Sequence, residues 1–415
     1  MRKPIPVVEA VRLVMENAQA IGTEMIPLED TYGRILAEPI IAKHDVPPFN
    51  RSPYDGFAVR AEDTAGASGD NRVPFKVIGE IGAGHVADRE IGKGEAYRIM
   101  TGAPIPINAD AVVMLEQTVE TPEAFTLRKP FTSGENISLQ GEDAKDGEKL
   151  IEEGTLIHPG TIALLATFGY AQVKVAKLPV VGILSTGTEL LRVDEELTPG
   201  KIRNSNGPMI AAQLARMGIG HKSYGMLIDD LDACTETVKR ALDESDVLIT
   251  TGGVSVGDYD YLPAIYERLG AKVLFNKVGM RPGSVTTVAV LGEKLLFGLS
   301  GNPSACFTGF ELFTRPAILK KMGTKKPYMP RMKAILGEDF TKPNPFTRFV
   351  RAVWETSEEG IIVVPAGFNK SGAVSSIARG NCIMVLPSGS RGFTTGMEVD
   401  ILLLGAEQGV EDWTL

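Results

Sequence analysis

The segment from Val180 to about Met322 alternates continuous apolar strands with amphipathic helices, and this alternation constrains the fold more than any other feature. Apolar runs such as "PVVGILST" and "DVLIT" are followed by helical patterns such as "LDACTETVKRALDES". Strands that are apolar throughout are typical of a parallel sheet with helices on both faces. We therefore predict a central α/β domain with a parallel-rich sheet over residues 179–325.

The parts of the chain on either side of this segment have short strands instead. Between residues 73 and 139, runs such as "FKVIGEI" and "AVVML" are separated by Gly and Pro turns, which predicts a β-rich domain over residues 51–139. Short strands return after "KKPYMP", so residues 326–415 are predicted to form a second β domain. A chain of 415 residues is too long for one core, so several domains are expected.

The chain begins with "PVVEAVRLVMENA", which predicts an amphipathic helix. Its apolar side would carry Val8, Val11, Val14 and Met15, and Pro27 marks the latest point at which it ends. Such a helix must pack its apolar side against another part of the chain.

Composition and charge exclude several classes of function. The net charge of −9, without a long basic run, argues against nucleic-acid binding. No apolar run reaches the ~18 residues of a membrane span, and the start lacks the apolar core of a signal peptide, so we expect a cytoplasmic protein without a membrane partner. Three widely spaced cysteines argue against a disulfide framework, and the histidines lack the spacing of zinc ligands.

Ligands of open α/β sheets bind at the carboxyl ends of the strands, and two loops there carry acidic residues. "STGTEL" ends one strand and contains Glu189; alone, it also reads as a turn that caps the next element. "TTGGVSVGDYDYL" follows another strand, and Gly252 and Gly253 let its backbone turn and expose N–H groups to a ligand. Asp258 and Asp260 then hold a Mg²⁺ shared with a phosphate, or cap the following helix, or divide these two roles between them.

Two further loops at the same edge suit an anion. In "NKVGMRPGS", Lys277 and Arg281 follow a period of two, so both cations would line one face. In "LSGNPSA", Ser300 precedes a turn and Asn302 precedes the last helix, whose first N–H groups suit an anion. Neither GxGxxG after the first strand nor GxxxxGK[ST] occurs, which argues against a Rossmann cofactor site and a Walker NTPase.

Taken in order, several motifs resemble those of the MoeA and gephyrin E-domain family, the molybdopterin molybdenumtransferases. The resemblance covers nearly the whole chain and rests on "PPFNRSPYDGFAV", "IMTGAPIPINADAVV", "GED", "STGTEL", "TTGGVSVGDYDYL", "MRPG", "LSGNPSA" and "GNCIMVLP". It implies an elongated homodimer with a shared active site, in which residues 1–50 and 140–178 form a discontinuous linking and dimerisation domain. It also implies a molybdopterin-binding α/β domain and a barrel-like C-terminal β domain.

The resemblance also implies a reaction. The family takes adenylylated molybdopterin and molybdate as substrates, inserts molybdenum at the dithiolene sulfurs and releases AMP, with Mg²⁺ assisting. An upstream molybdopterin adenylyltransferase is then a possible partner. Alternatives are a tungsten-inserting relative and a non-catalytic scaffold of the same fold.

The family's site residues map onto this sequence motif by motif. The resemblance implies catalytic roles for Asp55, Thr101, Asp143, Glu189 and Asp260. It implies substrate binding by Gly252, Gly253, Ser255, Lys277, Arg281, Ser300, Asn302, Arg351, Ser375 and Ser376, with Arg351 and one of the two serines on molybdate. It implies metal ligands among Asp229, Asp230, Asp258, Asp260 and Glu189. The family's "KPGKP" is "RPGSV" here, so Arg281 replaces a lysine and Ser284 stands where a second cation is common.

Overall fold

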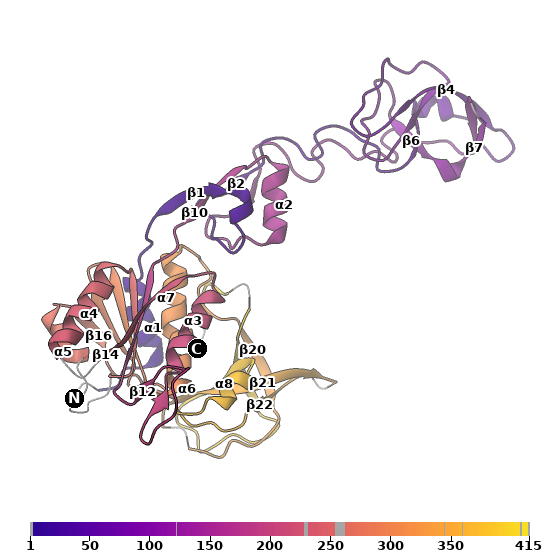
Figure 1. Ribbon diagram of the computed structural model, residues 1–415. Coiled ribbons are helices and arrows are strands. Elements are labelled where there is room, and N and C mark those ends of the chain that lie inside the picture. The colour runs from indigo at the N-terminus through magenta and orange to yellow at the C-terminus, as the bar shows by residue number, and fades with distance from the viewer. Residues whose placement is uncertain are drawn as a thin grey trace. The chain divides into compact units, whose positions relative to one another are not determined.

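The computed structural model describes residues 3–121, 123–227, 231–253, 262–343, 345–358, 360–406 and 409–413. The chain divides into two compact units. One comprises Met1–Glu38, Glu153–Ala166 and Tyr170–Leu415, and the other comprises Pro39–Glu152 and Thr167–Gly169. Within the larger unit, Figure 1 shows a helix-covered sheet followed along the chain by a β structure.

The larger unit is built on the predicted parallel-rich sheet, which is confirmed. Its strand order is β14-β11-β15-β19-β18-β16. Strands β14, β11, β15 and β19 are parallel, whereas β18 is antiparallel to both of its neighbours. The bounds are β11 Val181–Thr186, β14 His221–Leu227, β15 Val247–Thr251, β16 Lys272–Phe275, β18 Thr287–Leu291 and β19 Lys294–Leu299.

Helices cover both faces of this sheet (Figure 1) because successive side chains of each strand point to opposite faces. In β15, Val247 and Ile249 pack in one core with α1, α3, α6 and α7, whereas Leu248 packs in another core with α4 and α5. The bounds are α1 Val7–Asn17, α3 Asn206–Ala215, α4 Leu231–Asp243, α5 Leu262–Arg268, α6 Pro303–Gly309 and α7 Arg315–Lys321.

The N-terminal helix α1 is present as predicted, with one difference on its apolar side. Val11, Val14 and Met15 are buried as expected, whereas Val8 is 52% exposed and its neighbour Val7 is buried instead. The helix packs into the core of the α/β sheet with residues such as Phe275, and the same core also includes Ala176 and Leu156 from residues 140–178. A short helix is positioned by the largest apolar surface it can reach, and here that surface is the sheet core.

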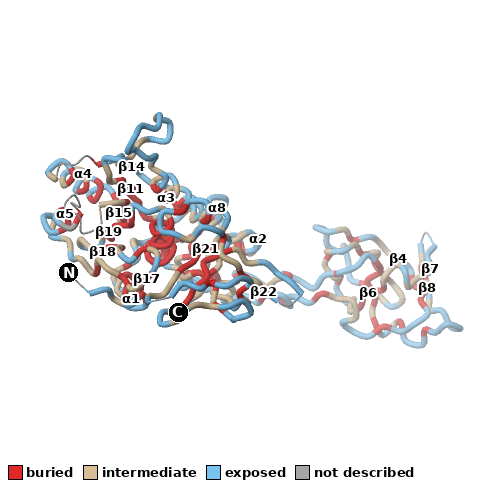
Figure 2. Tube along the Cα trace, turned by 90° about the horizontal axis from the view of Figure 1, so that it is seen from below, coloured by how far each residue is buried: buried red, intermediate tan, exposed pale blue. Residues whose placement is uncertain are grey.

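The C-terminal part of the larger unit is a closed β-barrel, as the resemblance implied. Strand β21 pairs with both β22 and β23, and the ring continues through β24 and β20 back to β22. Figure 2 shows buried residues along these strands. The bounds are β17 Met280–Arg281, β20 Arg331–Leu336, β21 Thr347–Ser357, β22 Gly360–Pro365, α8 Ser375–Arg379, β23 Cys382–Leu386 and β24 Glu398–Leu403.

The smaller unit contains the predicted N-terminal β domain. Its main sheet has the order β6-β3-β5-β4-β8-β7, around a core that includes Phe57, Phe75 and Phe125. The Phe57 and Phe125 rings are stacked with centroids 4.0 Å apart. The bounds are β3 Gly56–Val59, β4 Val73–Ile81, β5 Glu95–Ile99, β6 Ala111–Met114, β7 Thr118–Thr121 and β8 Ala124–Leu127.

Segments from the two halves of the predicted linking domain pair with each other. Strand β1 pairs with β10 in the larger unit, and β2 pairs with β9 in the smaller one. The four domain boundaries themselves stay predictions. The bounds are β1 Thr23–Pro27, β2 Ile40–Ile41, β9 Lys149–Ile151, α2 Pro159–Thr167 and β10 Gln172–Ala176. No helix in the described part of the chain is long and apolar enough to cross a membrane.

Candidate functional site

A cavity of about 1140 Å³ lies at the carboxyl edge of the parallel strands. Its lining includes Thr186 at the end of β11, Leu227 at the end of β14, Thr251 at the end of β15 and Ser300 after β19. Barrel residues between Phe340 and Ser371 line it as well. The site is therefore at the strand ends, where open α/β sheets bind their ligands.

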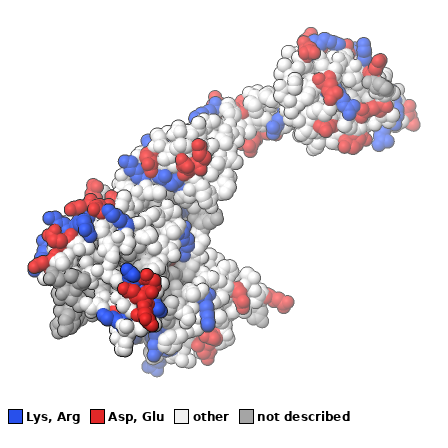
Figure 3. Space-filling model, in the orientation of Figure 1, with Lys and Arg blue, Asp and Glu red and all other residues white. Residues whose placement is uncertain are grey.

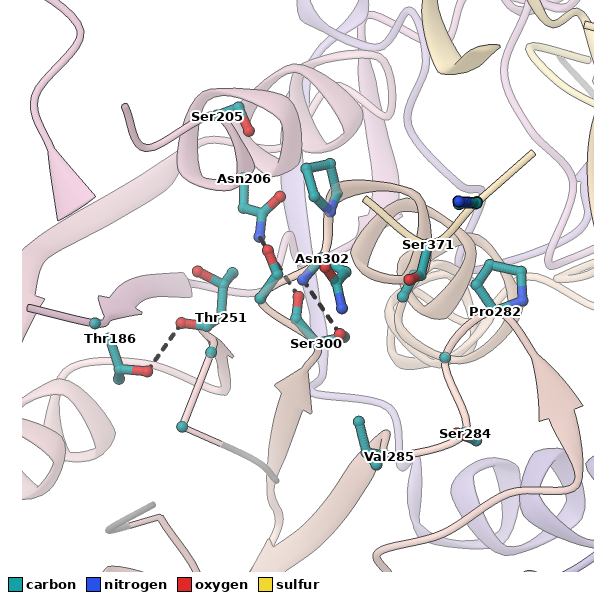
Figure 4. Close-up of a pocket in the computed structure, with 18 of the residues that line it drawn as sticks. Thr186, Ser205, Asn206, Thr251, Pro282, Ser284, Val285, Ser300, Asn302 and Ser371 are labelled. Carbon is teal, nitrogen blue, oxygen red and sulfur yellow. Dashed lines mark hydrogen bonds between the residues drawn. The ribbon is translucent and has the colours of Figure 1, made fainter. Parts of the chain in front are cut away.

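The first two loops are held together by contacts that only glycine allows (Figure 4). The Thr186 hydroxyl donates to the carbonyl of Thr251 at 3.1 Å. Gly252 has a φ of +83°, and a Cβ there would meet the Thr186 carbonyl oxygen at 2.5 Å. At Gly253 a Cβ would lie 2.8 Å from the Thr186 hydroxyl. Both predicted glycines thus bring the loops together at the cavity wall.

The loop after β19 is held by Asn206, the first residue of α3 (Figure 4). Its side-chain N–H group donates to the carbonyls of Ser300 at 3.4 Å and Gly301 at 2.9 Å. The Ser300 hydroxyl accepts the N–H of Asn302 at 3.2 Å. Ser300 and Asn302 both line the cavity, as predicted from "LSGNPSA".

The lining is strongly cationic. The lining residues that the structure describes include six Lys or Arg residues but one acidic residue, Glu189. The face shown in Figure 3 instead carries intermingled charges of both signs. An excess of positive charge in a cleft attracts anionic ligands. The cations are Arg203, Arg281, Lys342, Arg348, Arg351 and Lys370.

Arg351, in strand β21, is the buried member of this set. It is 2% exposed, and its hydrogen bonds to the carbonyls of Phe349 and Lys370 and to the Ser376 hydroxyl are all 3.4 Å long. Its Nε has no partner among the described residues. Burial lowers the pKa of Arg351 to about 10, so it remains a cation at neutral pH. A buried cation with weak neutral partners is suited to receive an anion.

Two further arginines of the cavity lie against aromatic rings. The guanidinium carbon of Arg281 is 5.8 Å from the ring centre of Phe346, and that of Arg348 is 5.7 Å from the ring centre of Phe340. Burial, and next the positive charge of Arg281, lower the pKa of Arg348. The two cations therefore lie within electrostatic reach of each other, and an anion between them would relieve the repulsion.

Three predicted residues of the larger unit do not line the cavity. Arg281 does, but Lys277 does not, because the chain turns between them instead of continuing as a strand. Ser375 is the exposed first residue of α8, also outside the lining. Ser376 is buried and reaches the site only through its bond to Arg351.

The smaller unit holds another group of predicted residues. One carboxylate oxygen of Asp55 accepts both the backbone N–H of Thr101 at 2.7 Å and its hydroxyl at 2.9 Å. These bonds, the backbone one first, lower the pKa of Asp55, so it is ionised at neutral pH. Asp143 is exposed, and its backbone N–H donates to Val46.

The remaining predicted residues lie outside the described residues. They are Asp229, Asp230, Ser255, Asp258 and Asp260. In the described part of the chain, no group of three or more His, Cys, Asp or Glu side chains could hold a metal ion. Glu189 is the carboxylate that reaches the cavity there. It folds back over Gly187, where a Cβ would meet its carboxylate oxygen at 2.5 Å.

Sequence reasoning missed several lining residues. Asn206, and Asn204, which donates to the Ser185 hydroxyl at 2.8 Å, come from the polar run "RNSN" before an apolar helix. That run is a recognisable signal, because it sits between a strand-end loop and a helix start. Lys342, Arg348 and Lys370 carry no such signal, since only the barrel brings them to the cavity.

Comparison with known families matches three models in order along the chain. They are the MoeA N-terminal region (domain I and II) at residues 5–169, "Probable molybdopterin binding domain" at residues 182–320, and the MoeA C-terminal region (domain IV) at residues 333–404. The cavity lies between parts of the second and third matches.

Curated relatives and solved structures agree with these models. Proteins named molybdopterin molybdenumtransferase from Staphylococcus aureus (strain COL) and Staphylococcus epidermidis (strain ATCC 12228) are 55% and 54% identical, each over 100% of this chain and 99% of theirs. The molybdopterin biosynthesis moeA protein from Pyrococcus horikoshii OT3 is 33% identical with a TM-score of 0.85, covering 97% of this chain and 100% of that one. The chain therefore belongs to the MoeA family of molybdopterin molybdenumtransferases, and it is an enzyme.

We predict that Gly252→Ala loosens the cavity wall. The added methyl group would press on the Thr186 carbonyl and strain a positive φ, at a cost of about 1–3 kcal/mol. The measurement is amide hydrogen exchange at position 252, whose N–H donates to Leu299, together with the melting temperature. Gly220→Ala is the matched control, since a Cβ there meets nothing within 4 Å. Equal protection in both variants would contradict this account of the wall.

Proposed function

We propose that this enzyme inserts molybdenum into adenylylated molybdopterin and releases AMP, with the assistance of Mg²⁺. The observation that carries the proposal is the cationic cavity at the strand ends, with six Lys or Arg side chains and one carboxylate among the described lining residues. Adenylylated molybdopterin contains a pyrophosphate and molybdate is a dianion, so both substrates need positive charge.

The pyrophosphate fits the part of the cavity nearest the sheet. The Ser300 hydroxyl can donate its hydrogen to a phosphate oxygen, and Arg281 adds a fork that can hold two phosphate oxygens. These groups are fixed before the substrate arrives, so they can stabilise charge that develops on the departing AMP phosphate. Arg281 in place of a lysine keeps the charge and changes its geometry.

Molybdate fits the barrel side of the cavity, at Arg351. The free Nε of this buried guanidinium can donate to one oxyanion oxygen, and the Ser376 hydroxyl is already its neighbour. Arg351 is buried and forms no ion pair with a carboxylate among the described residues. A dianion that enters the cavity would supply the opposite charge. Tungstate has the same shape and charge, so the site admits it as an alternative substrate.

The residues present also fit a bound Mg²⁺. The ion prefers one or two carboxylates together with substrate phosphates and water, and Glu189 supplies one carboxylate at the cavity. When bound there, Mg²⁺ would withdraw charge from a phosphate oxygen. Asp258, Asp260, Asp229 and Asp230 remain proposed ligands outside the described residues.

We further propose a homodimer in which the Asp55–Thr101 pair and Asp143 of one subunit complete the site of the other. The Asp55 carboxylate is ionised and held by two hydrogen bonds, which suits a catalytic or metal-binding role better than a turn alone would require. The supplier of the adenylylated substrate would be a molybdopterin adenylyltransferase. The three cysteines are buried free thiols, which suits the reducing cytoplasm.

We predict that wild-type enzyme releases AMP from adenylylated molybdopterin when molybdate and Mg²⁺ are added, and that Glu189→Gln lowers this rate by about 100-fold. The amide keeps the shape of the side chain but removes the charge that would hold the ion. Chromatography of AMP measures the rate, and repeating it with tungstate tests metal choice.

Glu196→Gln is the matched control for this variant. It removes the same charge from an exposed position seven residues further along the chain, outside the cavity lining, and should leave the rate unchanged. If Glu189→Gln and Glu196→Gln both behave like wild type, Glu189 has no part in the reaction. If wild type itself releases no AMP, the proposed reaction is wrong.

We predict that a shared site shows intersubunit complementation. Asp55→Asn and Arg351→Gln should each inactivate the enzyme, because they damage different contributions to one site. When both variants are co-expressed with different tags, half of the dimers are mixed and half of their sites are intact, so activity should return to roughly a quarter of wild type. Activity that stays at the level of the single variants would place both residues in a site within one subunit.

A further inference from the structure

Glu311 is a buried carboxylate that the reaction described above does not use. It lies in the π-helical segment η4 (Phe310–Thr314), between α6 and α7, and is 2% exposed. One of its oxygens accepts the side-chain N–H of Gln213 at 2.7 Å and a guanidinium N–H of Arg216 at 2.6 Å. Both donors come from the C-terminal end of α3.

The N-terminal end of α3 is tied to the same stretch of chain. Asn206, its first residue, donates to the carbonyls of Ser300 and Gly301 at the cavity. The chain then runs from this loop through α6 into η4, where Glu311 lies. Helix α3 is therefore joined at one end to the cavity loop and at the other to Glu311.

A merely structural role would not require a charge at this position. The free-energy cost of removing the Glu311 and Arg216 charges from water offsets much of the attraction between them. A pair of apolar side chains could therefore join η4 to α3 at least as well. Polar groups differ from apolar ones in that their bonds fix one register of one helix against another. The second oxygen of Glu311 and the amide oxygen of Gln213 are buried without partners among the described residues. Their lost hydration therefore adds to the free-energy cost of burying this polar group.

We propose that Glu311 is a positioning residue for the substrate site. By fixing the C-terminal end of α3, it sets where Asn206 lies, and Asn206 in turn sets the Ser300–Asn302 loop that faces the ligand. The inference deepens the proposed function and rests on it for its kinetic readout. Its binding readout needs only molybdopterin itself.

The principal test is Glu311→Gln, which keeps the shape and removes the charge. The dissociation constant for molybdopterin, followed by pterin fluorescence, should rise by about 3- to 10-fold, and KM for AMP release should rise with it. The kcat value should change by less than about twofold, because bound substrate restores the loop. Asn206→Ala should weaken binding further, and the double variant should match Asn206→Ala alone, since both substitutions act through one connection.

Lys321→Met is the matched control. Lys321 is an equally buried charge on the same helical run, and its ammonium donates to the carbonyls of Gln19 and Glu293, away from the cavity. It should lower the melting temperature without changing the dissociation constant. Arg216→Gln removes the ion pair from its more exposed side, and it should weaken binding in the same direction if Glu311→Gln folds poorly.

Two outcomes would overturn the inference. Either Glu311→Gln and Arg216→Gln, like Lys321→Met, lower the melting temperature alone, or the losses from Glu311→Gln and Asn206→Ala multiply in the double variant. Neither outcome depends on AMP release. An absence of AMP release in wild type would contradict the proposed reaction and leave the binding comparison to decide the role of Glu311.

Discussion

The site depends on an excess of positive charge, because its described lining contains six Lys or Arg residues and one carboxylate, that of Glu189. Arg351 is buried in the barrel wall with only long bonds to neutral oxygens, and Arg281 and Arg348 lie within each other's field. Such an arrangement opposes folding, because like charges repel and buried charge is costly. It is stable only on a scaffold rigid enough to hold it, and here the scaffold is a helix-covered sheet and a closed barrel. An anionic substrate that binds there would offset both the repulsion between the cations and the cost of burying Arg351.

Close backbone packing at the sheet edge complements this charge. Gly252 and Gly253 sit against Thr186, and Asn206 holds the loop after β19 by its carbonyls. Thr186, Thr251, Ser300 and Asn302 from these loops all line one cavity (Figure 4). The loops at the sheet edge thus supply mainly neutral polar groups and the barrel side supplies most of the cations, so a ligand with both phosphate and oxyanion groups would bridge the two.

The sequence predicted the sheet well because continuous apolar strands and amphipathic helices leave few other folds. Recognisable strand ends also placed Gly252, Ser300 and Asn302 near the carboxyl edge, where the structure has them in the cavity lining, whereas the role of Glu189 came from the resemblance and, like the roles of the others, stays a prediction. Sequence reasoning failed where position depends on the tertiary fold. Lys277 and Arg281 share a period of two, yet the chain turns between them and only Arg281 reaches the cavity. Arg351, Ser375 and Ser376 were predicted from the family resemblance alone. Lys342, Arg348 and Lys370 were not predicted, because no local pattern shows which barrel residues line the cavity.

The measurement that tests the central claim most directly is the anomalous scattering of molybdenum in crystals soaked with molybdate and molybdopterin. The account predicts a molybdenum peak in the cavity, with an oxyanion oxygen about 2.9 Å from Nε of Arg351, and loss of that peak in crystals of Arg351→Gln. A molybdenum peak elsewhere on the protein, or one in the cavity that persists unchanged in Arg351→Gln, would contradict it.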